Sequence, residues 1–168
     1  MDLDYISHVP ENFLPESRVW VYQCDRLLRI SEALELEEMF EKFIPAWNSH
    51  GTPVKGFANL FFGKFIVFIA DEKASKVSGC STDSSVALVR KAEKLFKVNF
   101  FDRQILNFIV KDKIEAIPLS QFSYAIQNGH LQPGTLYFNN TVLNLEDWRK
   151  NWIIPIDQSW LAAKMPVV

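Results

Sequence analysis

Residues 56–96 read GFANLFFGKFIVFIADEKASKVSGCSTDSSVALVRKAEKLF, and this stretch decides the fold. An apolar run over residues 57–62 is interrupted at Gly63 and Lys64, and a second apolar run covers residues 65–70. Two apolar runs around a short turn that contains glycine are typical of a β-hairpin. The second run is apolar at every position, which predicts a strand that is buried on both faces.

A helix is predicted after this hairpin, beyond a polar loop over residues 71–78. Thr82 or Asp83 is expected to cap it, because both residue types are preferred at helix N-termini. Its apolar positions recur at helical spacing, and we expect the following side chains to face inward: Val86, Val89, Ala92, Leu95 and Phe96.

Upstream, residues 1–17 are expected to form an irregular arm, and residues 18–23 read as a strand rich in β-branched and aromatic side chains. Ser31 is a candidate N-cap for a helix whose apolar stripe runs to Trp47. Pro45 should kink the last turn of this helix or end it near Ile44.

Downstream, residues 106–110 and 114–118 predict a second hairpin, and Ser120 is a candidate cap for a short helix. The tail begins at about residue 131. Three tryptophans without a clear period indicate that the tail wraps back over the body: Trp148, Trp152 and Trp160.

The central order of strand, helix, strand, strand, helix and strand predicts an α+β, ferredoxin-like split βαβ sandwich with an antiparallel sheet and a C-terminal extension. We expect one domain over residues 18–168. In this interpretation the first and third strands, residues 18–23 and 65–70, lie side by side and parallel. Cys24 and Cys80 should then share one edge of the sheet, away from His50.

Composition limits the function classes and the compartment. The net charge is −2, which gives no sign of a nucleic-acid binder. The chain has two cysteines, too few for a disulfide framework, and a reduced cytoplasmic setting is the simpler reading. The acidic N-terminus does not resemble a secretory signal. The most apolar window, residues 57–70, contains Lys64 and is too short to span a bilayer, so no membrane insertion is expected.

The segment GCSTDSS, residues 79–85, is the first candidate site. Backbone N–H groups at a helix start can hold an anion, and neighbouring hydroxyls would help to bind a phosphate or a carboxylate. Capping alone explains the same composition and is the preferred alternative, and Asp83 would repel an anion. The candidate ligand-binding residues of this segment are Ser81, Thr82, Asp83, Ser84 and Ser85.

Cys80 is a candidate catalytic nucleophile, because a cysteine near a helix N-terminus has a lowered pKa. Catalysis would require a nearby base, and the histidines are His8, His50 and His130. The alternative, which we favour, is a small buried hydrophobic side chain.

Two further positions are candidates for binding an acidic group. His50 and Lys55 lie in a polar cluster after the first helix, where a cation near the helix C-terminus also has a purely structural explanation. Arg103 can bind a carboxylate or a phosphate through two hydrogen bonds, or pair with a neighbouring acid. The tail aromatics are an alternative signal, for a protein interface.

Several common motifs are missing from the sequence. It contains no P-loop, no G-x-G-x-x-G, no H-E-x-x-H, no EF-hand pattern and no C-x-x-C. We therefore expect neither a cofactor nor a metal.

Six segments carry a resemblance to a known family: RVWVYQ (18–23), HGTPVKG (50–56), VSGCSTDSSV (77–86), FDR (101–103), LSQ (119–121) and LYFNNT (136–141). Together they cover most of the chain from Arg18 to Leu161. The sequence resembles an uncharacterised family of small bacterial proteins, found mainly in Bacteroidetes-type bacteria and often labelled "ABC transporter ATPase". The resemblance implies a bacterial cytosolic protein and brings no catalytic residues.

Three functions follow as hypotheses. The first is a non-catalytic binding module for a protein partner or a small anionic ligand. The second is a thiol-dependent enzyme that uses Cys80. The third is a nucleotide-binding ATPase, as the family label implies, which the missing P-loop disfavours.

Overall fold

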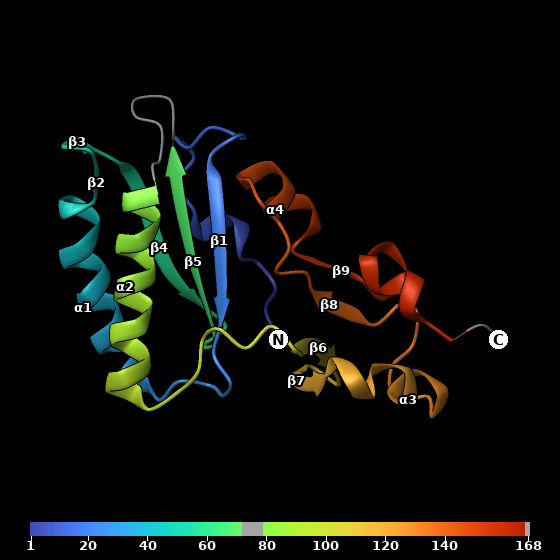
Figure 1. Cartoon of the computed structure of the whole chain (residues 1–168). Helices are drawn as coiled ribbons and strands as arrows, with labels where there is room; N and C mark the ends of the chain where they lie inside the picture. The colour runs from blue at the N-terminus through green and yellow to red at the C-terminus, as the bar shows by residue number, and fades with distance from the viewer. Residues whose placement is uncertain (72–78, 167–168) are drawn as a thin grey trace.

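The strand β5 (Phe65–Asp71) is buried along its whole length and lies at the centre of the first sheet. The computed structural model describes residues 1–71 and 79–166, and the side chains of residues 79–81 lie outside that description (Figure 1). In this sheet, β5 pairs antiparallel with β1 (Arg18–Gln23) on one side and with β4 (Lys55–Phe61) on the other. The predicted hairpin and its buried second strand are therefore confirmed.

Two helices, α1 (Ile30–Ala46) and α2 (Gly79–Phe96), cover one face of this sheet (Figure 1). Leu36 and Phe40 of α1 and Val89 of α2 pack on Phe68 of β5 and its neighbours. Alternate side chains of a strand point to opposite faces, so Phe68 faces the helices while its neighbours in the chain face the other side.

The helix boundaries differ from the predicted ones. Arg29 precedes α1, in place of the predicted Ser31, and its backbone N–H donates to the Glu32 side chain at 2.8 Å. Pro45 lies in the last turn, one residue before the helix ends.

The helix α2 also starts earlier than the predicted caps. It begins at Gly79, so Thr82 and Asp83 lie inside its first turns. Leu95 is 47% exposed, and its predicted inward orientation is wrong, whereas Val89, Ala92 and Phe96 are buried.

The second face of the first sheet is covered by both ends of the chain. Trp148 of α4 (Leu145–Asn151) and Trp152 directly after it are fully buried. They pack with Phe65 and with Tyr5 of the N-terminal arm in one hydrophobic cluster. The predicted wrapping of the tail holds for these two tryptophans, whereas Trp160 is 39% exposed.

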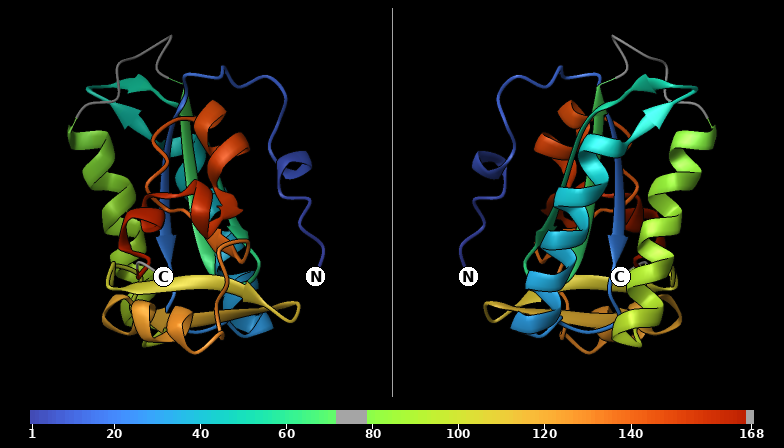
Figure 2. Two further views of the ribbon diagram at one scale, coloured as in Figure 1. Left: turned by 90° about the vertical axis from the view of Figure 1, so that its right-hand side faces the viewer. Right: turned by 90° about the vertical axis from the view of Figure 1, so that its left-hand side faces the viewer.

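A second antiparallel sheet has the strand order β7-β6-β8-β9 and lies beside the first one (Figure 2). The helix α3 (Phe122–Gln127) packs on it through Phe122 and Ala125. The predicted second hairpin, β6 to β7, is confirmed, with Lys111 and Asp112 both at positive φ in its turn. The bounds of these strands are β6 Ile105–Val110, β7 Lys113–Pro118, β8 Leu136–Phe138 and β9 Ile153–Pro155.

The remaining elements are short. The strands β2 (Asn48–Ser49) and β3 (Thr52–Pro53) form a small hairpin after α1. Four 3₁₀ helices complete the described part of the chain: η1 Ile6–His8, η2 Leu119–Gln121, η3 Ile156–Gln158 and η4 Trp160–Lys164. Neither in residues 1–71 nor in residues 79–166 does a helix have the length and apolar character that a membrane span requires.

The mixed α and β composition and the antiparallel sheets match the predicted fold class, but the ferredoxin-like arrangement as a whole is not confirmed. β6, the predicted fourth strand, belongs to the second sheet. β1 and β5 are neighbours, as predicted, but they are antiparallel. The reason is geometric: β4 and β5 form a hairpin, and the α1 crossover makes β1 parallel to β4, so β5 must oppose both.

The predicted placement of the two cysteines fails with the parallel pairing. Arg18 pairs with Ala70, so Cys24, after the other end of β1, is far from the end of β5 that leads to α2. The start of α2, where Cys80 lies, is instead near the β2–β3 hairpin that carries His50 (Figure 1). Cys80 therefore lies at the same end of the sheet as His50, and Cys24 lies at the opposite end.

Candidate ligand-binding site

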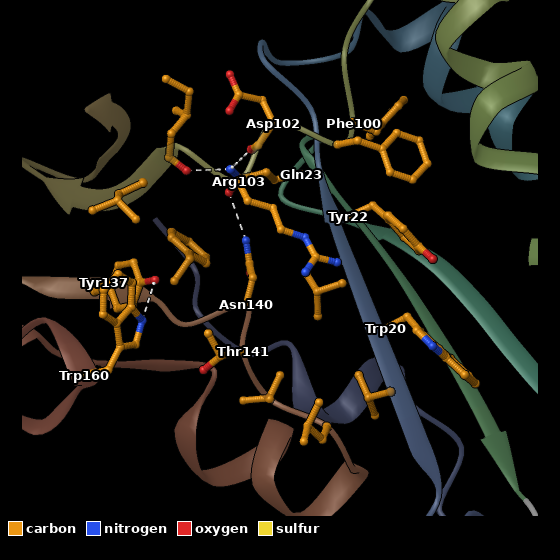
Figure 3. Close-up of a pocket in the computed structure, with 18 residues that line it drawn as sticks. Trp20, Tyr22, Gln23, Phe100, Asp102, Arg103, Tyr137, Asn140, Thr141 and Trp160 are labelled. Carbon is orange, nitrogen blue, oxygen red and sulfur yellow. Dashed lines mark hydrogen bonds between the residues drawn. The ribbon is translucent and has the colours of Figure 1, made fainter. Parts of the chain in front are cut away.

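A cleft of about 390 Å³ lies beside the outer edge of β1 (Figure 3). One wall is β1, and the others come from residues 100–106, residues 137–143 and Trp160. Its volume falls within the range of small-molecule sites, about 300–1,000 Å³.

The cleft exists because β1 and the segment after β8 separate from each other. At one end they pair: the Val19 N–H donates to the Leu143 carbonyl at 3.0 Å, and the Leu145 N–H donates to the Ser17 carbonyl at 2.8 Å. Beyond this pairing, residues 139–142 lead away from β1 toward β8. The two segments therefore enclose a space that widens from the Val19 end toward the Gln23 end.

The Gln23 side chain closes the other end of the cleft. Its amide nitrogen donates to the Asp102 carbonyl at 2.8 Å and to the Ile105 carbonyl. Its amide oxygen accepts from Asn107 at 2.6 Å and from Asn140 at 2.9 Å. One neutral side chain thus joins β1, the 100–106 segment, β6 and the segment after β8.

Asn140 is fixed in turn by the core. Its side-chain oxygen accepts from the indole N–H of Trp152 at 3.0 Å, and Trp152 is fully buried. Asn107 is also fully buried. The closed end of the cleft is therefore a set of positioned, uncharged amides, which fixes the wall without adding charge to the site.

Arg103 supplies the positive charge. Its side chain extends into the cleft, with the guanidinium between Asn140 and Tyr22 (Figure 3). The residue is exposed, and it has no hydrogen bond or ion pair with the described part of the chain. A guanidinium in this state offers a planar set of N–H donors to an incoming carboxylate or phosphate.

Tyr22 and Phe101 form the aromatic wall beside Arg103. Their rings lie 5.3 Å apart at a steep angle, and the Arg90 guanidinium lies 3.7 Å from the centre of the Phe101 ring. Burial raises the pKa of Tyr22, and the hydrogen bond to Ser85 and the charge of Arg103 act in the opposite direction. Tyr22 therefore stays a neutral phenol at physiological pH and adds no negative charge beside Arg103.

Leu143 and Trp160 form an apolar rim of the cleft that is open to solvent. Leu143 is 74% exposed and Trp160 is 39% exposed. The Trp160 indole N–H donates to the Tyr137 hydroxyl at 3.3 Å, and burial raises the pKa of Tyr137 to about 12. The cleft thus combines this apolar rim with the guanidinium of Arg103.

Of the predicted site residues, Arg103 lines the cleft. His50 is exposed in the turn between β2 and β3 at positive φ. The Lys55 ammonium donates to the Asn12 carbonyl and to the Asp71 carboxylate, the latter at 3.3 Å. It also lies 4.8 Å from the Phe13 ring centre. Lys55 therefore holds the N-terminal arm on the first sheet, which is a structural role.

The predicted anion site at the start of α2 is described only in part, and its residues do not line the cleft. Ser85 is fully buried, donates to the Thr82 carbonyl at 2.8 Å and is hydrogen-bonded to Tyr22. Asp83 and Ser84 are exposed. The side chains of Cys80 and Ser81 lie outside the described residues, so the catalytic hypothesis for Cys80 stays a prediction.

Cys24 is the cysteine whose side chain is described. It is 1% exposed, and burial raises the pKa of its thiol to about 11. A thiol with this pKa is almost fully protonated at neutral pH, so it is a poor nucleophile.

Sequence reasoning missed Gln23, Asn107 and Asn140. Each stands in or near an apolar run: Gln23 closes RVWVYQ, Asn107 interrupts ILNFIV, and Asn140 is the second residue after LYF. A polar amide in a buried strand needs partners, and that requirement is the signal that could have marked these three positions. Which amide meets which depends on the pairing of distant segments.

No protein-family model matches the chain, and neither a curated protein nor a solved structure matches it.

Proposed function

We propose that this protein is a non-catalytic binding module and that its cleft takes a small anionic ligand, with Arg103 as the binding cation. The observation that carries the proposal is the Arg103 guanidinium, which extends into a cleft of about 390 Å³ without an ion pair among the described residues. A carboxylate or a phosphate would complete its hydrogen bonds.

The lining of the cleft supports binding over catalysis. Its described residues include no histidine, cysteine or lysine, and Asp102 is the carboxylate among them that could act as a base. The Asp102 carboxylate accepts from the Gln104 N–H at 2.8 Å, so one of its oxygens already has a partner. The amides around Gln23 bond to one another and position the wall.

A reduced cytoplasmic compartment is part of this proposal. It rests on the buried, free Cys24 and on the small number of cysteines. The binding role extends to a protein partner only if that partner presents an anionic group to Arg103.

The test is thermal unfolding of the purified protein with a panel of simple anions: acetate, succinate, citrate, inorganic phosphate and AMP. A ligand that binds the folded state raises Tm, by an amount that corresponds to about 2.7 kcal/mol at one hundred times its Kd. We expect at least one carboxylate or phosphate to raise Tm, and this shift to disappear in Arg103→Met.

Lys91→Gln is the matched control, because it removes one positive charge from an exposed position of α2 that does not line the cleft. It should keep the full ligand-induced shift. The proposal is overturned if no anion in the panel changes Tm, or if Arg103→Met keeps the same shift as the wild type.

A further inference from the structure

The outer edge of β1 is open over the length of the cleft. β1 and β4 are the two edges of the first sheet, because β5 lies between them. The chain after α2 does not return to β1, since β6 pairs with β7 and β8 in the second sheet. Among the residues that the structure describes, the β1 edge along the cleft is paired at its Val19 end, through Leu143.

The backbone of Val21 faces this open edge. In an antiparallel sheet, successive residues direct their N–H and C=O groups alternately to one neighbour and to the other. The Cys24 N–H bonds toward β5 at Lys64, and the Val19 N–H bonds away from β5 at Leu143. Val21, two residues after Val19, therefore points away from β5, and its N–H and C=O have no partner among the described residues.

We propose that the cleft binds the C-terminal end of an extended peptide, whose backbone pairs with Val21 and whose terminal carboxylate binds Arg103. Adding a strand to an exposed sheet edge is a recurring mode of peptide recognition, in which backbone hydrogen bonds give affinity and pockets for alternate side chains give specificity. This inference rests on the proposed function and names the ligand class.

The dimensions of the cleft limit the peptide to a short segment. Strands advance about 3.3 Å per residue, so the edge from Val21 to Gln23 is about 7 Å long and pairs with two or three residues. Pairing at Val19 with Leu143 closes the edge on one side, and the Gln23 amide cluster closes it on the other. A chain end fits this space, whereas an internal segment would have to leave it at both sides.

The walls match the two faces of an extended peptide. Alternate side chains of a strand point in opposite directions. One would meet the apolar rim of Leu143 and Trp160, and the next would meet the aromatic wall of Tyr22 and Phe101. The charge of Arg103 complements a terminal carboxylate, and the neighbouring amides are neutral, so an apolar C-terminal sequence is the favoured ligand.

The experiment measures the binding of N-acetylated tripeptides by calorimetry to the full-length protein. The probes are acetyl-Leu-Val-Leu as the free acid, the same peptide as the C-terminal amide, and the free acid N-methylated at each residue in turn. Sodium acetate and N-acetyl-leucine are the small carboxylates for comparison. N-methylation leaves the protein unchanged, so any loss of binding is independent of folding.

We expect the free acid to bind at least tenfold more tightly than acetate, and the amide to bind about 10- to 100-fold more weakly than the acid, since hydrogen bonds to a charged group contribute about 1.5–3 kcal/mol. N-methylation at one position, the residue opposite Val21, should reduce affinity by at least tenfold. Arg103→Met should bind acid and amide equally.

The outcomes separate this inference from the proposed function. If acetate or phosphate binds through Arg103 but the peptide acid binds no more tightly than N-acetyl-leucine, the peptide inference is wrong and the anion site stands. The same conclusion follows if no N-methylated peptide loses affinity. If neither the peptides nor the simple anions bind, both proposals are wrong.

Discussion

The Glu32 carboxylate joins two arginines at the start of α1. It accepts from Arg26 at 2.7 and 2.9 Å and from the Arg29 side chain at 2.7 Å, and the residue is 5% exposed. Arg26 also donates to the Phe96 carbonyl at 3.0 Å, which ties the start of α1 to the end of α2. The hydrogen bonds from Arg26, and then those from Arg29, hold the pKa of Glu32 well below its ordinary value of 4.5.

A lowered carboxylate pKa in the folded state predicts a loss of stability at low pH. The contribution of Glu32 is fully present above pH 4.5 and decreases as the pH falls toward its folded-state pKa. Glu32→Gln should lower Tm at pH 7 and flatten the decline of Tm between pH 4.5 and pH 2.5. Exposed Glu37 on the same helix is the control, and Glu37→Gln should keep the wild-type slope. Parallel slopes for wild type and Glu32→Gln would contradict the assignment.

At the scale of elements, Gly56 sets the distance between β4 and the end of α1. A Cβ atom at this position would lie 2.5 Å from Cε3 of Trp47, whose side chain is 2% exposed. Gly56→Ala would displace Trp47 from its contacts with Phe43 and Phe68. Overpacking of this kind costs about 1–3 kcal/mol.

The matched control for this prediction is Gly134→Ala, because a Cβ atom at Gly134 meets nothing within 4 Å and its φ is not positive. Urea unfolding monitored by tryptophan fluorescence gives the free energy of unfolding of each variant. We expect a lower midpoint for Gly56→Ala and an unchanged or slightly raised midpoint for Gly134→Ala. Equal midpoints would show that Trp47 can move at no cost.

Local patterns predicted most of the elements, because their causes lie within a few residues. The run from Phe65 to Ala70 is apolar at every position, and a central strand that is covered on both faces of its sheet buries such a run. The failures concern boundaries and partners. Ser31 resembles a cap, but Glu32 bonds back to Arg29 and shifts the helix start. Leu95 fits the helical period, but its side chain lies on an exposed side of α2.

At the scale of the whole molecule, the Gln23 side chain connects the two sheets. It extends from β1 in the first sheet to Ile105 and Asn107 on β6 in the second. Gln23→Leu would leave the fully buried Asn107 amide and two backbone carbonyls without this partner. A buried polar group without a partner costs about 1–3 kcal/mol, and the two carbonyls are only partly buried, so a total loss of roughly 2–4 kcal/mol is expected.

The measurement is urea unfolding followed by both far-UV circular dichroism and tryptophan fluorescence. The wild-type protein should show one unfolding transition with both probes, because the two sheets share a packed segment. Trp148 and Trp152 pack on the first sheet, and the strand that follows them in the chain, β9, belongs to the second sheet. Gln23→Leu should lower the midpoint, whereas Gln104→Leu, at an exposed position in the same region, should not. A wild-type midpoint in Gln23→Leu would mean that the amide cluster contributes nothing to stability.

The candidate site could be predicted only in part, because the cleft is a property of the whole molecule. Arg103 was found from its residue type alone. Its position beside Tyr22 and Asn140 depends on where the chain goes after α2 and after β8. The predicted parallel pairing placed Cys80 at the same edge of the sheet as Cys24, which is wrong, because it overlooked that a hairpin and a crossover together fix the direction of β5.

The burial of β5 has a consequence for the protein before it folds. Phe65 to Ala70 form six consecutive residues without charge, proline or glycine, which is the composition of segments that stack into amyloid-like fibrils. Lys64 and Asp71 flank this run directly, and charges in these positions oppose stacking of identical chains. During synthesis, β5 emerges after β1, α1 and β4. Both of its strand partners, β1 and β4, are therefore already available to pair with it when it leaves the ribosome.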